Sequence, residues 1–382
     1  MSHCVSATLR EKDFLVNLIE ATYIATHPDR DVEELAGAIA REQSLEIVRE
    51  LIPDSIAASH LGRVLAVDEL NDNQFALRIG YPEHLASGQT GQLLHLVYGN
   101  VSFYPRIRLT GLALPKSLVN ELGGPGAGLP GIRDYIQVAG RALLMTVLKP
   151  RGSTPEHLAD LALRFARGGG DIVKDDQNLV ERDIDTFRRR VGACARAIDQ
   201  AAQVTGRRCL YLPHVAGSGD HLERQLDQVV ELGLPGVVMC TWVMGLETAA
   251  RAARERGLMW LSHPAMAGVF TESADHGVST PVLLGTLARV AGADLSIFPG
   301  RGGRIESGHD DESSTCQALT EPLGDLKPTF PCLGGGKRLD QLAETAARLG
   351  PDLAIVVGGD LLRQGDQLET ATRQAIVQLE AG

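Results

Sequence analysis

The sequence predicts an α/β protein in which a (β/α)8 TIM barrel follows a smaller α+β domain. Two observations predict the barrel: short apolar runs recur between residue 142 and the chain end, and a helix-like amphipathic stretch follows each of them. Six of the eight runs end in a polar residue or in glycine, and the other two end in Trp242 and Pro299. The runs are Ala142–Lys149, Asp171–Asp176, Cys209–His214, Gly236–Trp242, Leu258–His263, Asp294–Pro299, Thr329–Gly336 and Asp352–Gly359. Because barrel enzymes carry their chemistry at the C-terminal strand ends, these polar tips are the first site candidates.

The helices expected between the runs include Pro155–Arg167, Asp185–Val204, Leu222–Leu232 and Leu339–Leu349. A barrel needs about 250 residues, so a chain of 382 residues leaves room for a second domain. We expect an N-terminal domain over residues 1–122, a glycine- and proline-rich linker over 123–140, and the barrel over 141–382.

The N-terminal part mixes strands and helices. Strands are predicted at Phe14–Ala25, Gly62–Glu69, Gln74–Ile79 and Ile107–Leu114. One helix is predicted at Glu33–Glu42, and Thr90–Leu96 is predicted to be the end of another. Asp31 is the expected N-cap of the first helix. Apolar residues of the first strand occupy both odd and even positions, so the sequence does not tell which face of the strand is buried.

Composition excludes several classes of protein. A net charge of −11 without a basic stripe argues against nucleic acid as a partner. No apolar run approaches the ~20 residues of a membrane span, and Ser2–Ile19 contains too many charges for a signal peptide. The six cysteines form no CxxC pair, which favours free thiols and a cytoplasmic location.

The segment from Gly168 to Gln177 holds the sharpest cluster. On a strand, Lys174 and Asp176 point to one side and Asp175 to the other. A lysine beside two aspartates at a barrel mouth suits a metal or an acid–base site. The alternative is a solvated, ion-paired strand end.

Lys149 and Arg151, at the first strand tip, offer two cations to an anionic substrate, although a strand-end lysine and a surface arginine would look the same. Glycines follow the seventh and eighth strands, where many barrels bind phosphate; tight turns are the alternative. These glycines are Gly334, Gly335, Gly336, Gly358 and Gly359.

Two histidines, His263 and His214, end the fifth and third strands, and each is either an active-site group or a core histidine. Arg301 lies on the loop after the sixth strand, which either closes over substrate or is a solvated turn. Cys240 and Cys332 have no base partner evident in the sequence, so we expect both in the core.

Taken together, Thr146–Arg151, Gly169–Gln177, His263–Met266, Gly334–Gly336 and Gly358–Gly359 resemble the ribulose-bisphosphate carboxylase (RuBisCO) large chain in order and spacing. The resemblance is closer to the RuBisCO-like, type IV proteins that do not fix carbon dioxide. It covers nearly the whole chain and implies a ferredoxin-like N-terminal domain before the barrel.

The resemblance also implies roles for single residues. Lys174 matches the lysine that takes up CO2 as a carbamate and then binds Mg²⁺, and Asp176 matches a second ligand. Gln177 stands where the family has a glutamate ligand. Lys149 matches a catalytic lysine, and His263 an active-site histidine.

Other matches concern the substrate. Gly335, Gly336, Gly358 and Gly359 match backbone contacts to substrate, while Gly334 replaces a serine and Arg151 a second lysine. Glu42 and Asn100 match N-terminal residues that reach the partner subunit's active site, which implies a homodimer.

Departures from the family argue against carboxylation. The loop Pro299–Gly308 lacks the lysine that stabilises carboxylation, Pro264 replaces a phosphate-binding arginine, and Ile47 replaces a threonine. These changes imply a substrate with one phosphate. Gln177 removes one negative charge from the metal site, so metal is either bound more weakly or lost.

The resemblance therefore implies an enzyme that enolises a small phosphorylated ketose or keto-acid. Isomerase, enolase and decarboxylase outcomes, in methionine salvage or sugar-acid breakdown, all remain open. The alternative is a catalytically silent binding or regulatory protein on the same scaffold.

Overall fold

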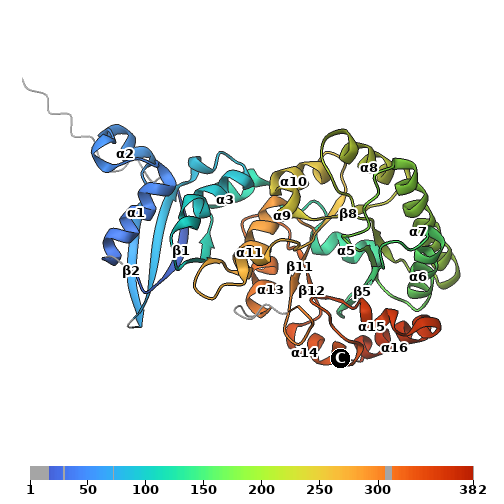
Figure 1. The fold of residues 1–382 in the computed structure, drawn as a ribbon. Helices are drawn as coiled ribbons and strands as arrows, with labels where there is room; N and C mark the ends of the chain where they lie inside the picture. The colour runs from blue at the N-terminus through green and yellow to red at the C-terminus, as the bar shows by residue number, and fades with distance from the viewer. Residues whose placement is uncertain (1–16, 29–30, 72, 306–311, 382) are drawn as a thin grey trace, which may run out of the picture.

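A closed barrel of parallel strands makes up the larger part of the molecule, and a smaller α+β unit adjoins it (Figure 1). The computed structural model describes residues 17–28, 31–71, 73–305 and 312–381. Cys4, most of the Ser2–Ile19 segment, the start of the first predicted strand and residues 306–308 of the 299–308 loop lie outside the described residues. Among the described helices, none combines the length and apolar character needed to cross a membrane.

All eight predicted barrel strands are present. Their order in the sheet is β7-β6-β5-β13-β12-β11-β9-β8, and a parallel bridge between His214 and Val238 joins β7 to β8. The strands are β5 (Leu143–Leu148), β6 (Ile172–Asp175), β7 (Leu210–Leu212), β8 (Gly236–Met239), β9 (Met259–Ser262), β11 (Leu295–Pro299), β12 (Phe330–Gly334) and β13 (Ala354–Val356).

The barrel strands are continuous apolar runs because each strand contacts two apolar layers, one inside the barrel and one under the helices. In β5, Leu143, Met145 and Val147 belong to the cluster inside the barrel, whereas Leu144 and Leu148 belong to the cluster under the helices. Strands buried on both faces have no polar side, so the period-two pattern disappears.

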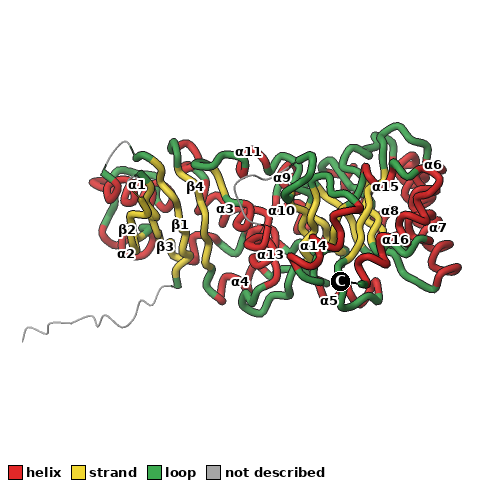
Figure 2. Tube along the Cα trace, turned by 90° about the horizontal axis from the view of Figure 1, so that it is seen from below, coloured by secondary structure: helices red, strands yellow, loops and turns green. Residues whose placement is uncertain are grey.

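Helices surround the barrel, as the tube in Figure 2 shows. The longer ones are α6 (Pro155–Arg167), α7 (Ile184–Thr205), α8 (Gly219–Glu231), α10 (Leu246–Arg254), α13 (Glu312–Thr320), α14 (Leu342–Leu349) and α16 (Leu368–Glu380). A π-helical turn (Pro281–Leu287) followed by α12 (Ala288–Ala291) covers the sheet before β11. Short helices follow three strand tips: α9 (Thr241–Met244), α11 (Gly268–Thr271) and α15 (Gly359–Leu362).

The N-terminal unit is a sheet of order β10-β4-β1-β3-β2 with helices against it. Its elements are β1 (Leu18–Thr26), α1 (Val32–Ser44), α2 (Asp54–His60), β2 (Arg63–Asn71), β3 (Gln74–Pro82), α3 (Thr90–Tyr98), β4 (Ile107–Ala113) and α4 (Lys116–Leu122). Burial decides the question that the sequence left open, because Ile19, Ala21, Tyr23 and Ala25 form the covered face of β1. Asp31 accepts a hydrogen bond from the backbone N–H of Glu34, as expected of the N-cap.

One strand of this sheet comes from the other unit. β10 (Gly277–Val278), in the connection after β9, pairs parallel to β4, and the buried Arg108 donates to the carbonyls of Thr271 and Ser273. The two units therefore share a sheet edge that no local sequence pattern indicated.

The segment 123–140, which we expected to be a linker, contains helix α5 (Gly128–Ile136). Ile132 and Ile136 are buried in the inner barrel cluster, and Asp294 accepts hydrogen bonds from the N–H groups of Ala127 and Gly128 at 2.8 and 2.7 Å. The glycines and prolines predicted a turn-rich connection. The apolar spacing of Ile132 and Ile136 was the signal of a packed helix.

Candidate active site

Two lysines lie at neighbouring strand tips. Lys149 follows β5 and approaches β13, because a Cβ built on Gly358 would lie 3.4 Å from the Lys149 Nζ atom. Lys174 is on β6, in register with Val147 of β5 and Leu212 of β7. The parallel sheet thus brings both amines to one end of the barrel.

Burial lowers the pKa of Lys174. Its side chain is 2 % exposed and its Nζ donates to the Asp175 carbonyl at 2.9 Å. Desolvation lowers the pKa of Lys174 to about 8, although the carboxylates of Asp176 and Asp175 act in the opposite direction. An appreciable fraction of this amine is therefore neutral near pH 7, as a nucleophile toward CO2 must be.

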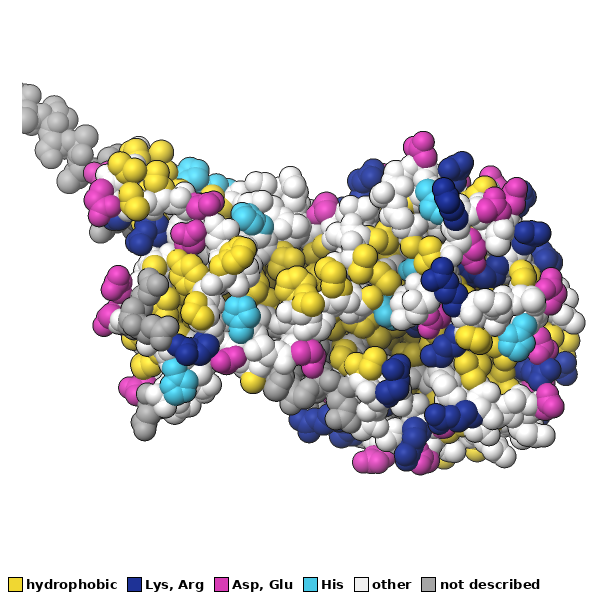
Figure 3. Space-filling model, viewed as in Figure 1, with side chains coloured by type: hydrophobic (Ala, Val, Ile, Leu, Met, Phe, Trp, Pro, Cys, Tyr) yellow, Lys and Arg dark blue, Asp and Glu magenta, His cyan; other side chains and the backbone are white. Residues whose placement is uncertain are grey.

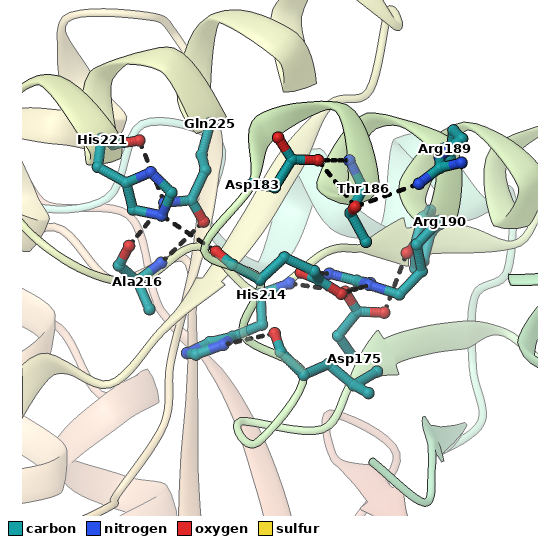
Figure 4. A network of polar contacts seen from close by, with 12 residues as sticks. Asp175, Asp183, Thr186, Arg189, Arg190, His214, Ala216, His221 and Gln225 are labelled. Carbon is teal, nitrogen blue, oxygen red and sulfur yellow. Dashed lines mark hydrogen bonds and ion pairs between the residues drawn. The ribbon is translucent and has the colours of Figure 1, made fainter. Parts of the chain in front are cut away.

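Asp175 points away from the mouth, into a polar network under α7 (Figure 4). It is fully buried and accepts hydrogen bonds from Arg190, from the Tyr211 hydroxyl at 2.9 Å and from the His214 N–H at 3.0 Å. Arg190 also pairs with Glu181. This network holds the end of β6, so the alternation expected for Lys174 and Asp175 is fixed by buried partners.

The next two side chains keep oxygen atoms available. Asp176 Oδ1 accepts from the backbone N–H and the side-chain amide of Asn178, both at 2.9 Å. The described residues supply no donor to Asp176 Oδ2 and no partner to the half-buried Gln177 amide. A carboxylate oxygen and an amide oxygen are hard ligands, so Asp176 and Gln177 are residues of the kind that hold Mg²⁺.

The glycines after β12 are required by close packing. Gly335 and Gly336 have φ of 97° and 101°, and the Ile305 N–H donates to the Gly335 carbonyl at 2.8 Å. A Cβ on Gly335 would lie 2.3 Å from the Ile305 carbonyl oxygen, so the loop after β11 rests on this turn. Within the described chain, no acceptor is bonded to the N–H groups of Gly335 and Gly336, so the turn also has donors to offer an anion.

Two buried residues that the sequence did not indicate, Glu312 and Lys337, hold the loop that carries Arg301. The Arg301 N–H donates to Glu312 Oε1 at 2.6 Å, and Lys337 Nζ donates to the Arg301 carbonyl. Glu312 and Lys337 are 3 % and 4 % exposed. Their partners are distant in sequence, so no local pattern indicates them; the Arg301 side chain itself is exposed.

His263 and His214 both lie beside Cys240. The Cys240 sulfur is 3.6 Å from His214 Nε2 and 4.0 Å from His263 Nδ1. Cys240 and Cys332 are both buried, as expected, but the two histidines beside Cys240 are neighbours that the sequence did not indicate. Burial raises the pKa of Cys240 to about 11 and lowers the pKa of both histidines.

The remaining candidates are dispersed. Arg151 is exposed on the loop after β5. Glu42 and Asn100 are hydrogen-bonded to each other at 3.0 Å and line a cavity of about 190 Å³ in the N-terminal unit. Helix α1, which carries Glu42, lies well away from the barrel strands (Figure 1), so one chain does not bring this pair to the lysines.

Comparison with known proteins identifies the family. Residues 128–366 match the catalytic domain of the ribulose bisphosphate carboxylase large chain, and residues 10–118 match its N-terminal domain. The chain belongs to the RuBisCO large-chain family. Within the family, this RuBisCO-like chain is 37 % identical over 360 residues to ribulose bisphosphate carboxylase-like protein 1 of Rhodopseudomonas palustris, covering 92 % of this chain and 94 % of the relative.

Two further relatives of this RuBisCO-like chain have named activities. A 5-methylthioribulose-1-phosphate isomerase of Rhodospirillum rubrum is 33 % identical, covering 94 % of this chain and 95 % of the relative. A 2,3-diketo-5-methylthiopentyl-1-phosphate enolase of Exiguobacterium sibiricum is 31 % identical, covering 79 % and 76 %. The crystal structure of a RuBisCO-like protein from Rhodopseudomonas palustris superimposes with a TM-score of 0.85 at 32 % identity, covering 95 % of this chain and 98 % of that one.

Proposed function

We propose that this chain enolises a phosphorylated ketose or keto-acid, with an isomerase, enolase or decarboxylase outcome, and does not fix CO2. The observation that carries the proposal is the pair of lysines at adjacent strand tips, one buried with a pKa of about 8. The similarity to an isomerase and an enolase named for methylthiopentose phosphates favours a substrate of that kind, as used in methionine salvage.

In this proposal each group has one task. Lys149, beside Gly358, removes the proton next to the substrate carbonyl. Backbone N–H groups of the glycine turns after β12 and β13 hold the phosphate. Carbamylated Lys174, Asp176 and Gln177 would hold Mg²⁺, which when bound polarises the carbonyl and stabilises the enediolate.

The loop after β11 and the side chains of Pro264 and Ile47 argue against carboxylation. The loop after β11 carries Arg301 and Arg304 but no lysine between Pro299 and Gly308. Pro264 and Ile47 cannot donate hydrogen bonds from their side chains to a second phosphate. A substrate with one phosphate therefore fits these positions better than a bisphosphate.

We also propose that the working unit is a homodimer. Glu42 and Asn100 lie apart from the lysines of their own chain, so a partner must supply them if they act at the site. Hydrophobic side chains gather across the face drawn in Figure 3, and exposed apolar residues include Phe103, Val243, Met266 and Val269. Such a surface suits contact with a second copy.

Proton exchange tests the enolisation. The protein would be incubated in D2O with Mg²⁺, bicarbonate and phosphorylated ketoses and keto-acids, including 5-methylthioribulose 1-phosphate, and followed by NMR. Exchange should be lost in Lys149→Met and Lys174→Ala and retained in Lys116→Met, an exposed lysine paired with Asp325. Protein that binds these compounds without exchanging any proton would contradict the proposal and favour a binding or regulatory protein.

Mixing two inactive variants tests the shared site. Glu42→Gln and Lys174→Ala damage different parts of the site, so a mixed dimer contains one intact site. If subunits exchange freely, the mixture should recover about a quarter of wild-type activity, since half of the dimers are mixed and half of their sites are intact. No recovery, with subunit exchange verified, would show that Glu42 acts within its own chain, and full activity of Glu42→Gln alone would show that it does not act at the site.

A further inference from the structure

Three polar side chains from consecutive barrel strands converge beside the proposed site. His214 follows β7, Cys240 follows β8 and His263 follows β9. The Cys240 sulfur lies 3.6 Å from His214 Nε2 and 4.0 Å from His263 Nδ1. The lysine chemistry proposed above gives these groups no task.

The surrounding hydrogen bonds determine where the thiol proton goes. The Ala265 N–H donates to His263 Nδ1 at 3.2 Å, so the lone pair of that nitrogen is already in use. His214 Nδ1 faces the Leu179 carbonyl at 3.5 Å, and a carbonyl can only accept. His214 therefore carries its proton on Nδ1, and its Nε2 lone pair accepts the Cys240 S–H.

Burial keeps both groups of the pair neutral, against the nearest charge of each. Burial raises the pKa of Cys240, with Lys174 and Asp176 as the charged groups facing it. Burial lowers the pKa of His214, which faces Asp175, Lys174 and Arg190. At neutral pH the pair is thus an undissociated thiol hydrogen-bonded to an uncharged imidazole, and the thiol has a proton to give.

Cys240 and His214 lie at a different part of the barrel mouth than Lys149. In the sheet order, β8 is separated from β5 by β7 and β6. Trp242, two residues after Cys240, has a buried indole N–H that finds no acceptor among the described residues. A substrate held between these strands would be flanked by Lys149 on one side and the thiol on the other.

We propose that Cys240, hydrogen-bonded to His214, is the second proton carrier of this site and protonates the enediolate on a carbon other than the one that Lys149 deprotonates. The inference rests on the proposed enolisation. Lys149 takes the first C–H proton. The Cys240 S–H bond then breaks as the new C–H bond forms on the former carbonyl carbon, and the proton of the neighbouring hydroxyl passes to the former carbonyl oxygen, so that this hydroxyl becomes the new carbonyl. Water returns a proton to the thiolate by way of His214, and Lys149 releases its proton to water, so no oxidant or other reactant is needed.

The assignment predicts that the chain completes an isomerisation, which needs two proton transfers, rather than stopping at a released enol. The test compares two rates for 5-methylthioribulose 1-phosphate in D2O: loss of the substrate C–H signal and formation of isomerised product. Cys240→Ser keeps a hydrogen bond to His214 but replaces the thiol with a much weaker acid. Cys332→Ser is the matched control, a buried barrel thiol whose sulfur donates to the Phe330 carbonyl.

The expected result is that Cys240→Ser retains C–H exchange within about twofold, while product formation falls about 100-fold, as for loss of a general acid. Cys332→Ser should keep both rates. The inference is overturned if product formation in Cys240→Ser stays within about twofold of wild type. It is also overturned if exchange and product formation fall together while the thermal unfolding midpoint is unchanged. Absence of exchange in the wild type is a separate outcome that refutes the proposed enolisation itself.

Discussion

Replacing Arg190 with methionine should destabilise the barrel more than any surface charge change. Arg190 is 4 % exposed and pairs with Asp175, which is 0 % exposed, and with Glu181, which is 13 % exposed. Its loss leaves a buried carboxylate without its cation, a change that costs about 3–5 kcal/mol. Because the Tyr211 hydroxyl and the His214 N–H still donate to Asp175, we expect about 3 kcal/mol.

Urea unfolding followed by tryptophan fluorescence measures this loss. Both tryptophans, Trp242 and Trp260, belong to the barrel, so the signal reports on that unit. Arg164→Met is the matched control, because Arg164 is 34 % exposed and pairs with Asp160 one helical turn away. Removing such an exposed pair should cost about 0–1 kcal/mol.

A double variant separates lost charge pairing from lost packing. Arg190→Met combined with Asp175→Asn removes both charges, so it should recover part of the stability lost in the single variant. A loss below about 1 kcal/mol in Arg190→Met, or no recovery in the double variant, would refute the view that the buried ion pair holds the end of β6.

Three further predictions concern the site. At fixed dissolved CO2, the rate of activation by carbamylation of Lys174 should rise about tenfold per pH unit below pH 8 and then level off. The reason is that the pKa of Lys174 is about 8 and only the neutral amine reacts with CO2. Stopped-flow measurements in which this rate levels off near pH 10.5 instead would contradict the prediction. Gln177→Glu should tighten Mg²⁺ binding about tenfold in calorimetry by restoring an anionic ligand, and unchanged affinity would remove residue 177 from the ligand set. Gly335→Ala should raise KM about tenfold or more. The new Cβ would lie 2.3 Å from the Ile305 carbonyl oxygen, and a φ of 97° strains a residue with a side chain by about 1–3 kcal/mol. An unchanged KM would show that this turn does not bind the phosphate.

The barrel strands and most of their helices could be predicted because their signals are local. Each strand is a short apolar run, and each run is bounded by residues that favour turns or caps. The face of β1 could not be predicted, since its apolar residues occupy both parities and only packing against α1 and α3 selects one. Helix α5 was missed because its glycines and prolines outweigh a short apolar spacing.

The candidate site divides in the same way. Lys149, Lys174 and the glycine turns were found from sequence because strand tips converge wherever a parallel barrel closes. The histidine neighbours of Cys240 were not predicted, and Glu312 and Lys337 were missed. Their partners lie 11 to 36 residues away along the chain, as in the Glu312–Arg301 and Lys337–Arg301 contacts.

The sequence by itself determined which residues form apolar runs, helix caps, turns and strand ends. These features in turn determined the fold, the family resemblance and the residues at the barrel mouth. Only the tertiary structure decided the charge state of Lys174, the partner of the Cys240 thiol and the packing of the Arg301 loop on the Gly335 turn. The physical reason is that pKa values and hydrogen-bond partners depend on burial and on distances across the barrel, and neither quantity is written in the order of residues along one chain.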